Sequence, residues 1–366
     1  MGTARESDSV STVLAAVIRE ACRARDGWLP FDRFMALALY APGLGYYANS
    51  SRKFGAMPAS GSDFVTAPEM STYFGRTLAN QVRQALQASG TDTVLEFGAG
   101  SGALAEQMLD ALGTDLRRYA IVELSGELRA RQQARLARFG ERLQWLDAWP
   151  EVTEGVVVGN EVLDAMPVQL LHFDGQRWFE RGVAVQADAF VWRDRPTELR
   201  PPVEAPYVPG TVTELHAQAL AWTTGLAQRL QRGVALLIDY GFPEAEYYLP
   251  QRHGGTLMCH RAHRADADPL TDVGLKDITA HVDFTGIALA AQETGCYVIG
   301  YTSQARFLVN CGLAGLLERA TLPEQVMAQR LITEHEMGEL FKVLAFARGC
   351  RFEPIGFVAG DRTHRL

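Results

Sequence analysis

Short apolar runs alternate with helical patterns through the middle of the chain. Strands are predicted at five segments, 93–97, 118–123, 143–146, 155–159 and 234–239. Helices with one apolar face are predicted between the first of these strands, at 102–112 and 125–138. Apolar strands separated by helices form parallel β-α units, because helices then cover both faces of the sheet. We therefore expect an α/β fold with a mostly parallel sheet.

The pattern changes on either side of this series. Helices are predicted in the first part of the chain at 11–26, 31–40 and 70–88, with a long irregular segment at 42–69. From 168 to 193 apolar positions recur with a period of two, and Asp174-Gly175 stands between two such runs, as in a β-hairpin. The remaining elements are predicted as helices at 211–231, 284–294, 303–312 and 323–332 and strands at 296–301 and 355–359. We therefore expect an N-terminal helical segment and an antiparallel insertion beside the parallel sheet.

Composition and charge restrict the classes of function. The net charge of −8 disfavours broad binding to nucleic acid, which usually requires a basic face. The five cysteines are scattered and never form a Cys-x-x-Cys pair, so we expect neither a disulfide framework nor a zinc site. No apolar run reaches the length of about 18 residues that a membrane span needs, and the N-terminus lacks the apolar core of a signal peptide. We therefore expect a cytoplasmic protein that binds no nucleic acid, membrane or metal.

The most informative motif follows the first strand of the series. Glu96 ends the apolar run, glycines stand at Gly98, Gly100 and Gly102, and a helical pattern then begins. The spacing is Gly-x-Gly-x-Gly, whereas nicotinamide dinucleotide sites use Gly-x-Gly-x-x-Gly around a diphosphate. A carboxylate at this position favours a ligand that carries positive charge and hydroxyl groups and no phosphate. S-adenosylmethionine (SAM) has a sulfonium, an ammonium and a ribose, so the motif favours a methyltransferase.

Three further strands of the series also end in polar residues. Glu123 and Leu124 follow the second strand, at a distance where a carboxylate can accept both ribose hydroxyls. Asp147 and Ala148 follow the third, where the adenine amino group is expected. Asn160-Glu161 closes the fourth. Ligands of open α/β sheets bind at the carboxyl ends of the strands, so these residues together predict one SAM site.

Seven segments, in order along the chain, carry a family pattern: Pro42-Gly-Leu-Gly-Tyr-Tyr, Gly61-Ser-Asp-Phe-Val-Thr-Ala-Pro-Glu, Glu96-Phe-Gly-Ala-Gly-Ser-Gly, Gly159-Asn-Glu-Val-Leu-Asp-Ala-Met-Pro-Val, Leu237-Ile-Asp-Tyr-Gly, Asp277-Ile-Thr-Ala-His-Val-Asp-Phe and Met337-Gly-Glu-Leu-Phe-Lys-Val-Leu. With these segments the chain resembles the MidA-like family, which includes the mitochondrial complex I assembly protein arginine methyltransferase. The resemblance implies a class I SAM-dependent methyltransferase (Rossmann-like) fold with a seven-stranded sheet. It also implies methylation of a protein arginine.

An arginine acceptor needs carboxylates that hold its planar guanidinium. Glu161 and Asp164 lie just past the fourth strand, and their spacing of three places both on one side of a helical turn. We expect them to form a guanidinium clamp, and His281, within the sixth family segment, to lie near the acceptor as a catalytic group. Asp239 and Tyr240, which end the fifth strand, are interpreted as packing residues of the sheet.

The resemblance also suggests that the irregular segment 42–69 folds over the cofactor as a lid. This segment would add four contacts to those of the strand ends. The expected cofactor-binding residues are Asp63, Thr66, Pro68, Glu69, Glu96, Gly98, Gly100, Gly102, Glu123, Leu124, Asp147, Ala148, Asn160 and Glu161.

Two domains are expected: an N-terminal helical region with the lid at 1–90, and a methyltransferase domain at 91–366 with insertions at about 168–232 and 241–280. The favoured partner is a protein substrate, and a homodimer is a possible assembly. Two alternatives stay open. The insertion and the helical tail could enclose a small-molecule acceptor, or the chain could be a non-catalytic assembly factor that keeps the SAM fold and binds a partner.

Overall fold

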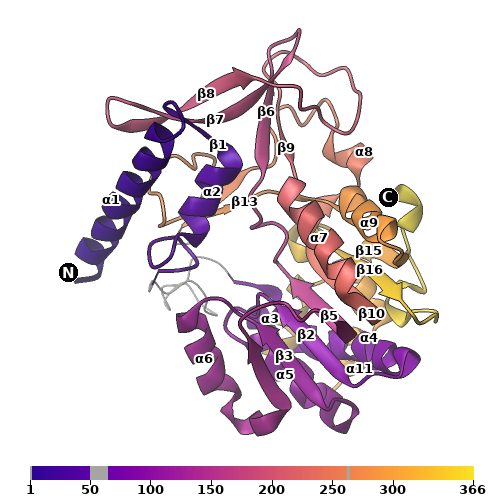
Figure 1. Cartoon of the computed structure of the whole chain (residues 1–366). Coiled ribbons are helices and arrows are strands. Elements are labelled where there is room, and N and C mark those ends of the chain that lie inside the picture. The colour runs from indigo at the N-terminus through magenta and orange to yellow at the C-terminus, as the bar shows by residue number, and fades with distance from the viewer. Residues whose placement is uncertain (1, 50–64, 262–263) are drawn as a thin grey trace.

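The computed structural model describes residues 2–49, 65–261 and 264–366 (Figure 1). Its helices are α1 (Gly2–Arg23), α2 (Phe31–Tyr40), α3 (Ala67–Met70), α4 (Tyr73–Ser89), α5 (Ala103–Leu112), α6 (Gly126–Leu136), α7 (Ala217–Arg229), α8 (Glu244–Tyr247), α9 (Phe284–Glu293), α10 (Gln304–Asn310), α11 (Leu313–Leu317) and α12 (Leu322–Arg330). Among the described residues, no helix has both the length and the apolarity needed to cross a membrane.

A central sheet organises the larger part of the molecule. Its strand order is β15 (Tyr297–Ser303), β16 (Phe341–Arg348), β10 (Leu230–Phe242), β5 (Thr153–Asn160), β2 (Thr93–Phe97), β3 (Arg118–Val122) and β4 (Leu143–Leu146). From β10 to β4 all neighbours are parallel, whereas β16 runs antiparallel to both of its neighbours. The short β14 (Val282–Asp283) pairs in parallel with the last residues of β10. The predicted α/β fold with a mostly parallel sheet is therefore confirmed.

The strand order reverses between β2 and β5. The chain proceeds from β2 to β3 and β4 on one side and returns to place β5 on the other side of β2. Crossovers leave in opposite directions at such a point, so the carboxyl ends of the two strands frame a crevice. Glu96 and Asn160 lie at these two ends. The topology therefore places the glycine motif and the Asn160-Glu161 pair beside one another.

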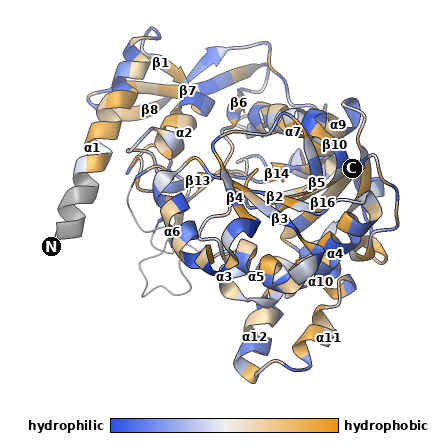
Figure 2. Cartoon of the chain, turned by 60° about the horizontal axis from the view of Figure 1, so that its bottom comes forward, coloured by the Kyte–Doolittle hydropathy of each residue, from blue (hydrophilic) through white to orange (hydrophobic). Residues whose placement is uncertain are grey.

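Helices cover both faces of the central sheet, because its inner strands are apolar on both sides. Val156 and Val158 of β5 pack with α4 and α5 on one face. Val157, between them, packs with α7 and α9 on the other. All three valines are fully buried. Figure 2 shows the apolar strands of the central sheet enclosed by these helices.

A smaller antiparallel sheet forms the upper part of the molecule in Figure 1. It contains β1 (Trp28–Pro30), β7 (Trp178–Gln186), β6 (Gln169–Phe173) and β9 (Val212–Leu215), and β8 (Ala189–Pro196) pairs with β7. A further three-stranded sheet has the order β12 (Arg264–Asp266), β11 (Met258–Arg261) and β13 (Asp277–Thr279). Both sheets share one hydrophobic core with α1 and α2, so the N-terminal helices pack on segments inserted much later in the chain.

Two element predictions were wrong. The segment 211–231 begins as the strand β9 before helix α7, because residues 212–215 pair with β6. The predicted last strand at 355–359 is a 3-10 turn, Ile355–Phe357, beside Pro354, and Gly356 packs so closely on Phe307 that a Cβ would meet its ring at 2.2 Å. The strand that fills this place in the sheet is β16, whose continuous apolar pattern does not distinguish a strand from a buried helix.

The central position of β10 predicts a large cost for shortening its side chains. Leu237 is fully buried in this strand, so Leu237→Ala should reduce the free energy of unfolding by about 3 kcal/mol, through the lost burial of the side chain and the cavity it leaves. Leu322→Ala is the matched control, because Leu322 is 72% exposed, and it should change stability by less than about 0.5 kcal/mol. Urea unfolding checks both values. Equal losses in the two variants would contradict this account of the core.

Candidate active site

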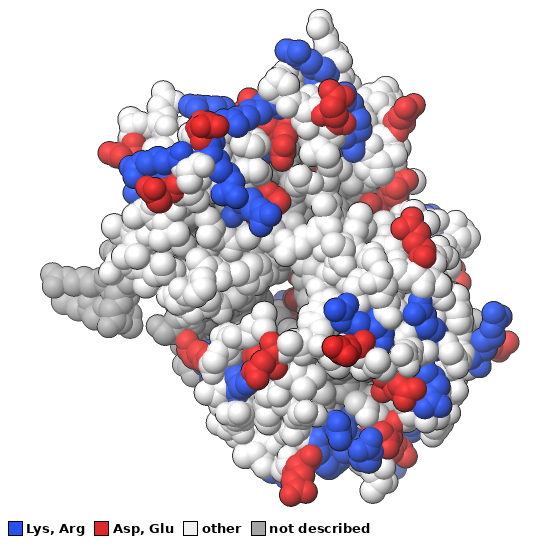
Figure 3. Space-filling view, viewed as in Figure 1, with Lys and Arg blue, Asp and Glu red and all other residues white. Residues whose placement is uncertain are grey.

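A cavity of about 1160 Å³ lies between the carboxyl edge of the central sheet and the smaller part of the molecule, which consists of α1, α2 and the two smaller sheets. Figure 3 shows the face hollowed between these two parts. Five carboxylates line the cavity, from Glu96, Glu123, Glu161, Asp164 and Asp277, and its described lining contains no lysine or arginine. The cavity is therefore suited to positively charged ligands.

The glycine turn forms one wall of the cavity. Gly98 and Gly100 line it and have φ angles of 65° and 53°, in the left-handed region that side chains disfavour. A Cβ on Gly98 would also approach the side chain of Val162 to 2.9 Å. Gly102, in contrast, faces Leu136 of α6 and does not line the cavity. The first two glycines bring the backbone to the cavity, whereas the third lets α5 and α6 approach each other.

Glu96 lies at the floor of the cavity and is 2% exposed. The hydroxyl of Tyr119 donates a hydrogen bond of 2.7 Å to its Oε2. Burial, with a smaller contribution from the neighbouring carboxylate of Glu123, raises the pKa of Glu96 to about 8, although the hydrogen bond from Tyr119 acts in the opposite direction. A cation beside Glu96 would favour its ionised form.

Glu123 is fixed at the end of β3 by two donors. Its Oε1 accepts the backbone N–H of Ser125 at 2.8 Å, and its Oε2 accepts Nε2 of Gln132 at 2.9 Å. The same Gln132 nitrogen donates to the carbonyl of Gly100 at 2.9 Å, which joins this carboxylate to the glycine turn. Burial raises the pKa of Glu123. Leu124 lies at the rim of the cavity with 82% of its surface exposed.

The turn after β5 depends on Asp239. One carboxylate oxygen of Asp239 accepts three consecutive backbone N–H groups, from Val162 at 3.1 Å, Leu163 at 2.9 Å and Asp164 at 3.2 Å. Glu161 begins this turn with a φ of 54°, an uncommon conformation for a residue with a side chain. Asp239 is completely buried at the end of β10, and burial raises its pKa well above the ordinary value. Its role is therefore more than the sheet packing that the sequence suggested.

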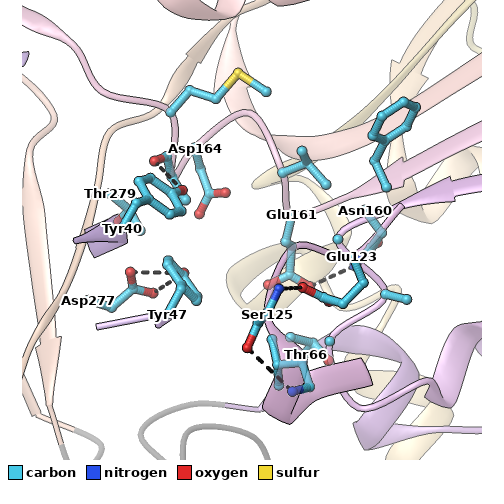
Figure 4. Close-up of a pocket in the computed structure, with 18 of the residues that line it drawn as sticks. Tyr40, Tyr47, Thr66, Glu123, Ser125, Asn160, Glu161, Asp164, Asp277 and Thr279 are labelled. Atoms are coloured by element: carbon cyan, nitrogen blue, oxygen red, sulfur yellow. Dashed lines mark hydrogen bonds between the residues drawn. The ribbon is translucent and has the colours of Figure 1, made fainter. Parts of the chain in front are cut away.

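Glu161 and Asp164 both reach the cavity from this turn, as Figure 4 shows. Asn160 donates to Oε1 of Glu161 at 3.0 Å, while burial and the nearby Asp164 raise the pKa of Glu161 to about 8. Tyr240 donates a short hydrogen bond to Oδ2 of Asp164, and burial raises the pKa of Asp164 to about 6. Oδ1 of Asp164 and Oδ1 of Asn160 are buried with no partner among the described residues.

The opposite wall comes from the smaller part of the molecule and was not predicted. The hydroxyl of Tyr47 donates to both oxygens of Asp277, at 2.9 Å each. The ring of Tyr47 stacks on that of Tyr40, with centroids 5.6 Å apart, and the hydroxyl of Tyr40 donates to the carbonyl of Ala165 at 2.8 Å. Figure 4 shows this group across the open space from Glu161. The aromatic Gly-Leu-Gly-Tyr-Tyr segment and the Asp277 motif were the available sequence signals.

His281 also lines the cavity. Its ring packs edge-on against Tyr240, with centroids 5.1 Å apart, and against Phe242. Burial, together with the nearby cations Arg252 and Lys342, lowers the pKa of His281 to about 4. The imidazole is therefore neutral at physiological pH, and its predicted catalytic role stays a prediction.

The remaining residues that the sequence predicts as cofactor contacts do not all line the cavity. Thr66 and Pro68 line the cavity, but Glu69 turns away to accept hydrogen bonds from Ser101 and, at 3.0 Å, from Arg135. Asp147 is exposed and pairs with Arg129 at 2.7 Å in a smaller hollow that Leu124 and Glu123 share.

Glu69 and Asp147 thus have cationic partners of their own and do not line the main cavity. Ala148 is exposed and also absent from its lining. Asp63 lies outside the described residues.

Comparison with known proteins identifies the family. Residues 77–302, more than half of the chain, match the family described as "Putative S-adenosyl-L-methionine-dependent methyltransferase". A crystal structure described as a "likely methyl transferase from Burkholderia thailandensis bound to S-adenosyl-homocysteine" is 49% identical, with a TM-score of 0.95, and the match covers 99% of this chain and 98% of that one.

Curated relatives are more distant. The "Protein arginine methyltransferase NDUFAF7 homolog, mitochondrial" of Caenorhabditis elegans is 25% identical, over 92% of this chain and 88% of that protein. Its namesake in Drosophila melanogaster is 28% identical, over 88% and 82% respectively. These relatives are named as mitochondrial proteins, which contradicts the predicted cytoplasmic location, and we withdraw that prediction.

The cavity fits the cofactor of this family. Its carboxylates suit the ammonium and sulfonium of SAM, and the Glu123 carboxylate retains lone pairs for ribose hydroxyls beyond the two hydrogen bonds it accepts. The volume exceeds the range of about 300–1,000 Å³ that is usual for a single small ligand, so space remains for an acceptor group. The fold, the cavity and the comparisons agree: the chain belongs to this family of SAM-dependent methyltransferases.

Proposed function

We propose that this enzyme methylates an arginine side chain of a protein. The observation that carries the proposal is the cavity itself, in which five carboxylates and no lysine or arginine occur among the described lining residues. SAM and arginine are both cations, and such a lining attracts both. The names of the curated relatives, which are protein arginine methyltransferases, support the same acceptor.

The cofactor half of the site would be formed by the ends of β2 and β3. Glu96 and the backbone at Gly98 and Gly100 would hold the amino-acid portion of SAM, and Glu123 would accept the ribose hydroxyls. Leu124, at the exposed rim, would cover the adenine. SAM supplies an electrophilic methyl group on a sulfonium that is already a good leaving group, so the protein's own task is to hold the acceptor in line.

The acceptor half would be formed by Glu161 and Asp164. Two carboxylates on one turn can receive the N–H groups of a guanidinium, and the three hydrogen bonds to Asp239 fix that turn. In the reaction a guanidinium nitrogen would form a bond to the methyl carbon of SAM while the bond between that carbon and sulfur breaks. The electron pair of the broken bond would stay on sulfur. The proton displaced from the nitrogen would pass to the carboxylate of Glu161, whose raised pKa suits a proton acceptor near neutral pH.

Transfer of a labelled methyl group from SAM into a cell lysate tests this function. We expect label in protein, and mass spectrometry should find it on arginine. Label only in small molecules, or on a different side chain, would contradict the proposal. A variant with Glu96 and Glu123 both changed to glutamine controls for label that other enzymes of the lysate incorporate.

Single variants should separate the two halves of the site. Glu123→Ala should weaken binding of S-adenosylhomocysteine, because it removes the acceptor for the ribose. Glu161→Gln should leave that affinity within a few-fold but reduce arginine methylation on the order of 100-fold, since charge-assisted hydrogen bonds contribute about 1.5–3 kcal/mol. Isothermal titration and product assays measure the two effects. Glu154→Gln is the matched control, because Glu154 lies on β5, the strand that precedes Glu161, but is exposed and paired with Arg232.

Activity should rise with pH on the acid side. The pKa values of Glu161 and Asp164 lie at about 8 and about 6, so both are increasingly protonated as pH falls through this window and cannot pair with a guanidinium. At saturating SAM, kcat/KM for the protein acceptor should increase up to about tenfold per pH unit between pH 6 and 8. Glu161→Gln should flatten the upper part of the profile. A wild-type profile that is flat or falls over this range would be inconsistent with the clamp.

A further inference from the structure

The cavity extends beyond the residues that the cofactor and the clamp require. Asp277 on β13 faces it from the smaller part of the molecule, whereas Glu161 and Asp164 face it from the central sheet. Figure 4 shows Asp277 and Tyr47 across the open space from Glu161. Asp277 is 3% exposed and is therefore largely removed from solvent.

The position of Asp277 is fixed by its neighbours. Tyr47 donates to both of its oxygens, and the ring of Tyr47 is held in turn by stacking on Tyr40. The hydroxyl of Tyr40 donates a hydrogen bond to the carbonyl of Ala165, directly after the turn that carries Glu161 and Asp164. The two parts of the molecule are thus connected directly beside the acceptor space.

The buried polar atoms in this space call for a ligand with several donors. Oδ1 of Asp164 and Oδ1 of Asn160 both lack a partner among the described residues, although both side chains are more than nine-tenths buried. Buried acceptors are normally satisfied by a hydrogen bond. A guanidinium offers five N–H donors in one plane, enough to reach carboxylates on two sides, whereas an ammonium offers three on one atom.

We propose that Asp277, held by Tyr47, is the second carboxylate arm of the acceptor site and selects a guanidinium over an amine. The inference rests on the proposed arginine acceptor. Glu161 and Asp164 would hold one edge of the guanidinium, and Asp277 would receive N–H groups from the side of the smaller part. Acceptor choice would then depend on a residue that does not touch the cofactor site.

The test uses the full chain loaded with S-adenosylhomocysteine. A blocked Gly-Arg-Gly peptide and a blocked Gly-Lys-Gly peptide serve as probes in ligand-observed NMR. We expect the wild type to bind the arginine peptide at least tenfold more tightly than the lysine peptide. Asp277→Asn should remove most of this preference and leave the affinity for S-adenosylhomocysteine within about twofold of the wild-type value.

Two further variants distinguish a direct role of Asp277 in acceptor choice from a general loss of local structure. Tyr47→Phe keeps the ring that stacks on Tyr40 and removes the hydroxyl that binds Asp277, so it should weaken the preference to a smaller extent. Asp272→Asn is the matched control, because that aspartate pairs with Arg261 on the surface of the same segment, and it should behave as the wild type.

The outcomes distinguish this inference from the proposed function. If the wild type methylates arginine and Asp277→Asn keeps the same KM and the same peptide preference, the role of Asp277 is refuted and the function stands. If the wild type shows no preference for the arginine peptide, the inference is also overturned. Absence of any arginine product in the lysate assay would overturn the proposed function as well.

Discussion

One carboxylate oxygen of Asp239 holds the turn on which the proposed acceptor site depends. It accepts three successive backbone N–H groups from Val162 to Asp164, although the side chain is completely buried. The turn lies where the strand order reverses, so it faces the glycine motif on the neighbouring strand. Glu161 can keep its left-handed backbone there because the following residues are fixed. A buried acid that is no part of the cavity wall thus determines where the two cavity acids point.

The acids of the cavity oppose folding only when they are ionised, and in that form they favour cationic ligands. Glu96 and Glu161 have pKa values of about 8, above the ordinary value of 4.5, so the folded protein binds more protons than the unfolded chain between these values. The stability that they contribute is complete below the unfolded pKa and is lost as pH rises through the folded pKa. Cations bound in the cavity favour the ionised carboxylates and offset this loss. The same burial that destabilises the free enzyme at neutral pH would therefore strengthen its attraction for SAM and for the proposed arginine acceptor.

The sequence indicates most of the residues that line the proposed cofactor half of the site, and only part of the proposed acceptor half. Glu96 lies next to the last residue of β2, Glu123 and Glu161 directly follow β3 and β5, and the carboxyl ends of parallel strands meet at one edge of the sheet. Tyr47 and Asp277 are 230 positions apart and meet through packing between the N-terminal helices and the insertions, which no local pattern encodes. The antiparallel strand β16 was missed for a related reason, since a continuous apolar run does not specify its partner.

The most direct measurement is the pKa of the Glu161 carboxyl, followed by ¹³C NMR and assigned with Glu161→Gln. In the protein loaded with S-adenosylhomocysteine, the pKa of this carboxyl should lie well above the ordinary value for glutamate. It should fall when a blocked arginine peptide binds, because the guanidinium stabilises the ionised form. A pKa near the ordinary value, or one that the arginine peptide leaves unchanged, would contradict the assignment of this acidic cavity as an arginine site.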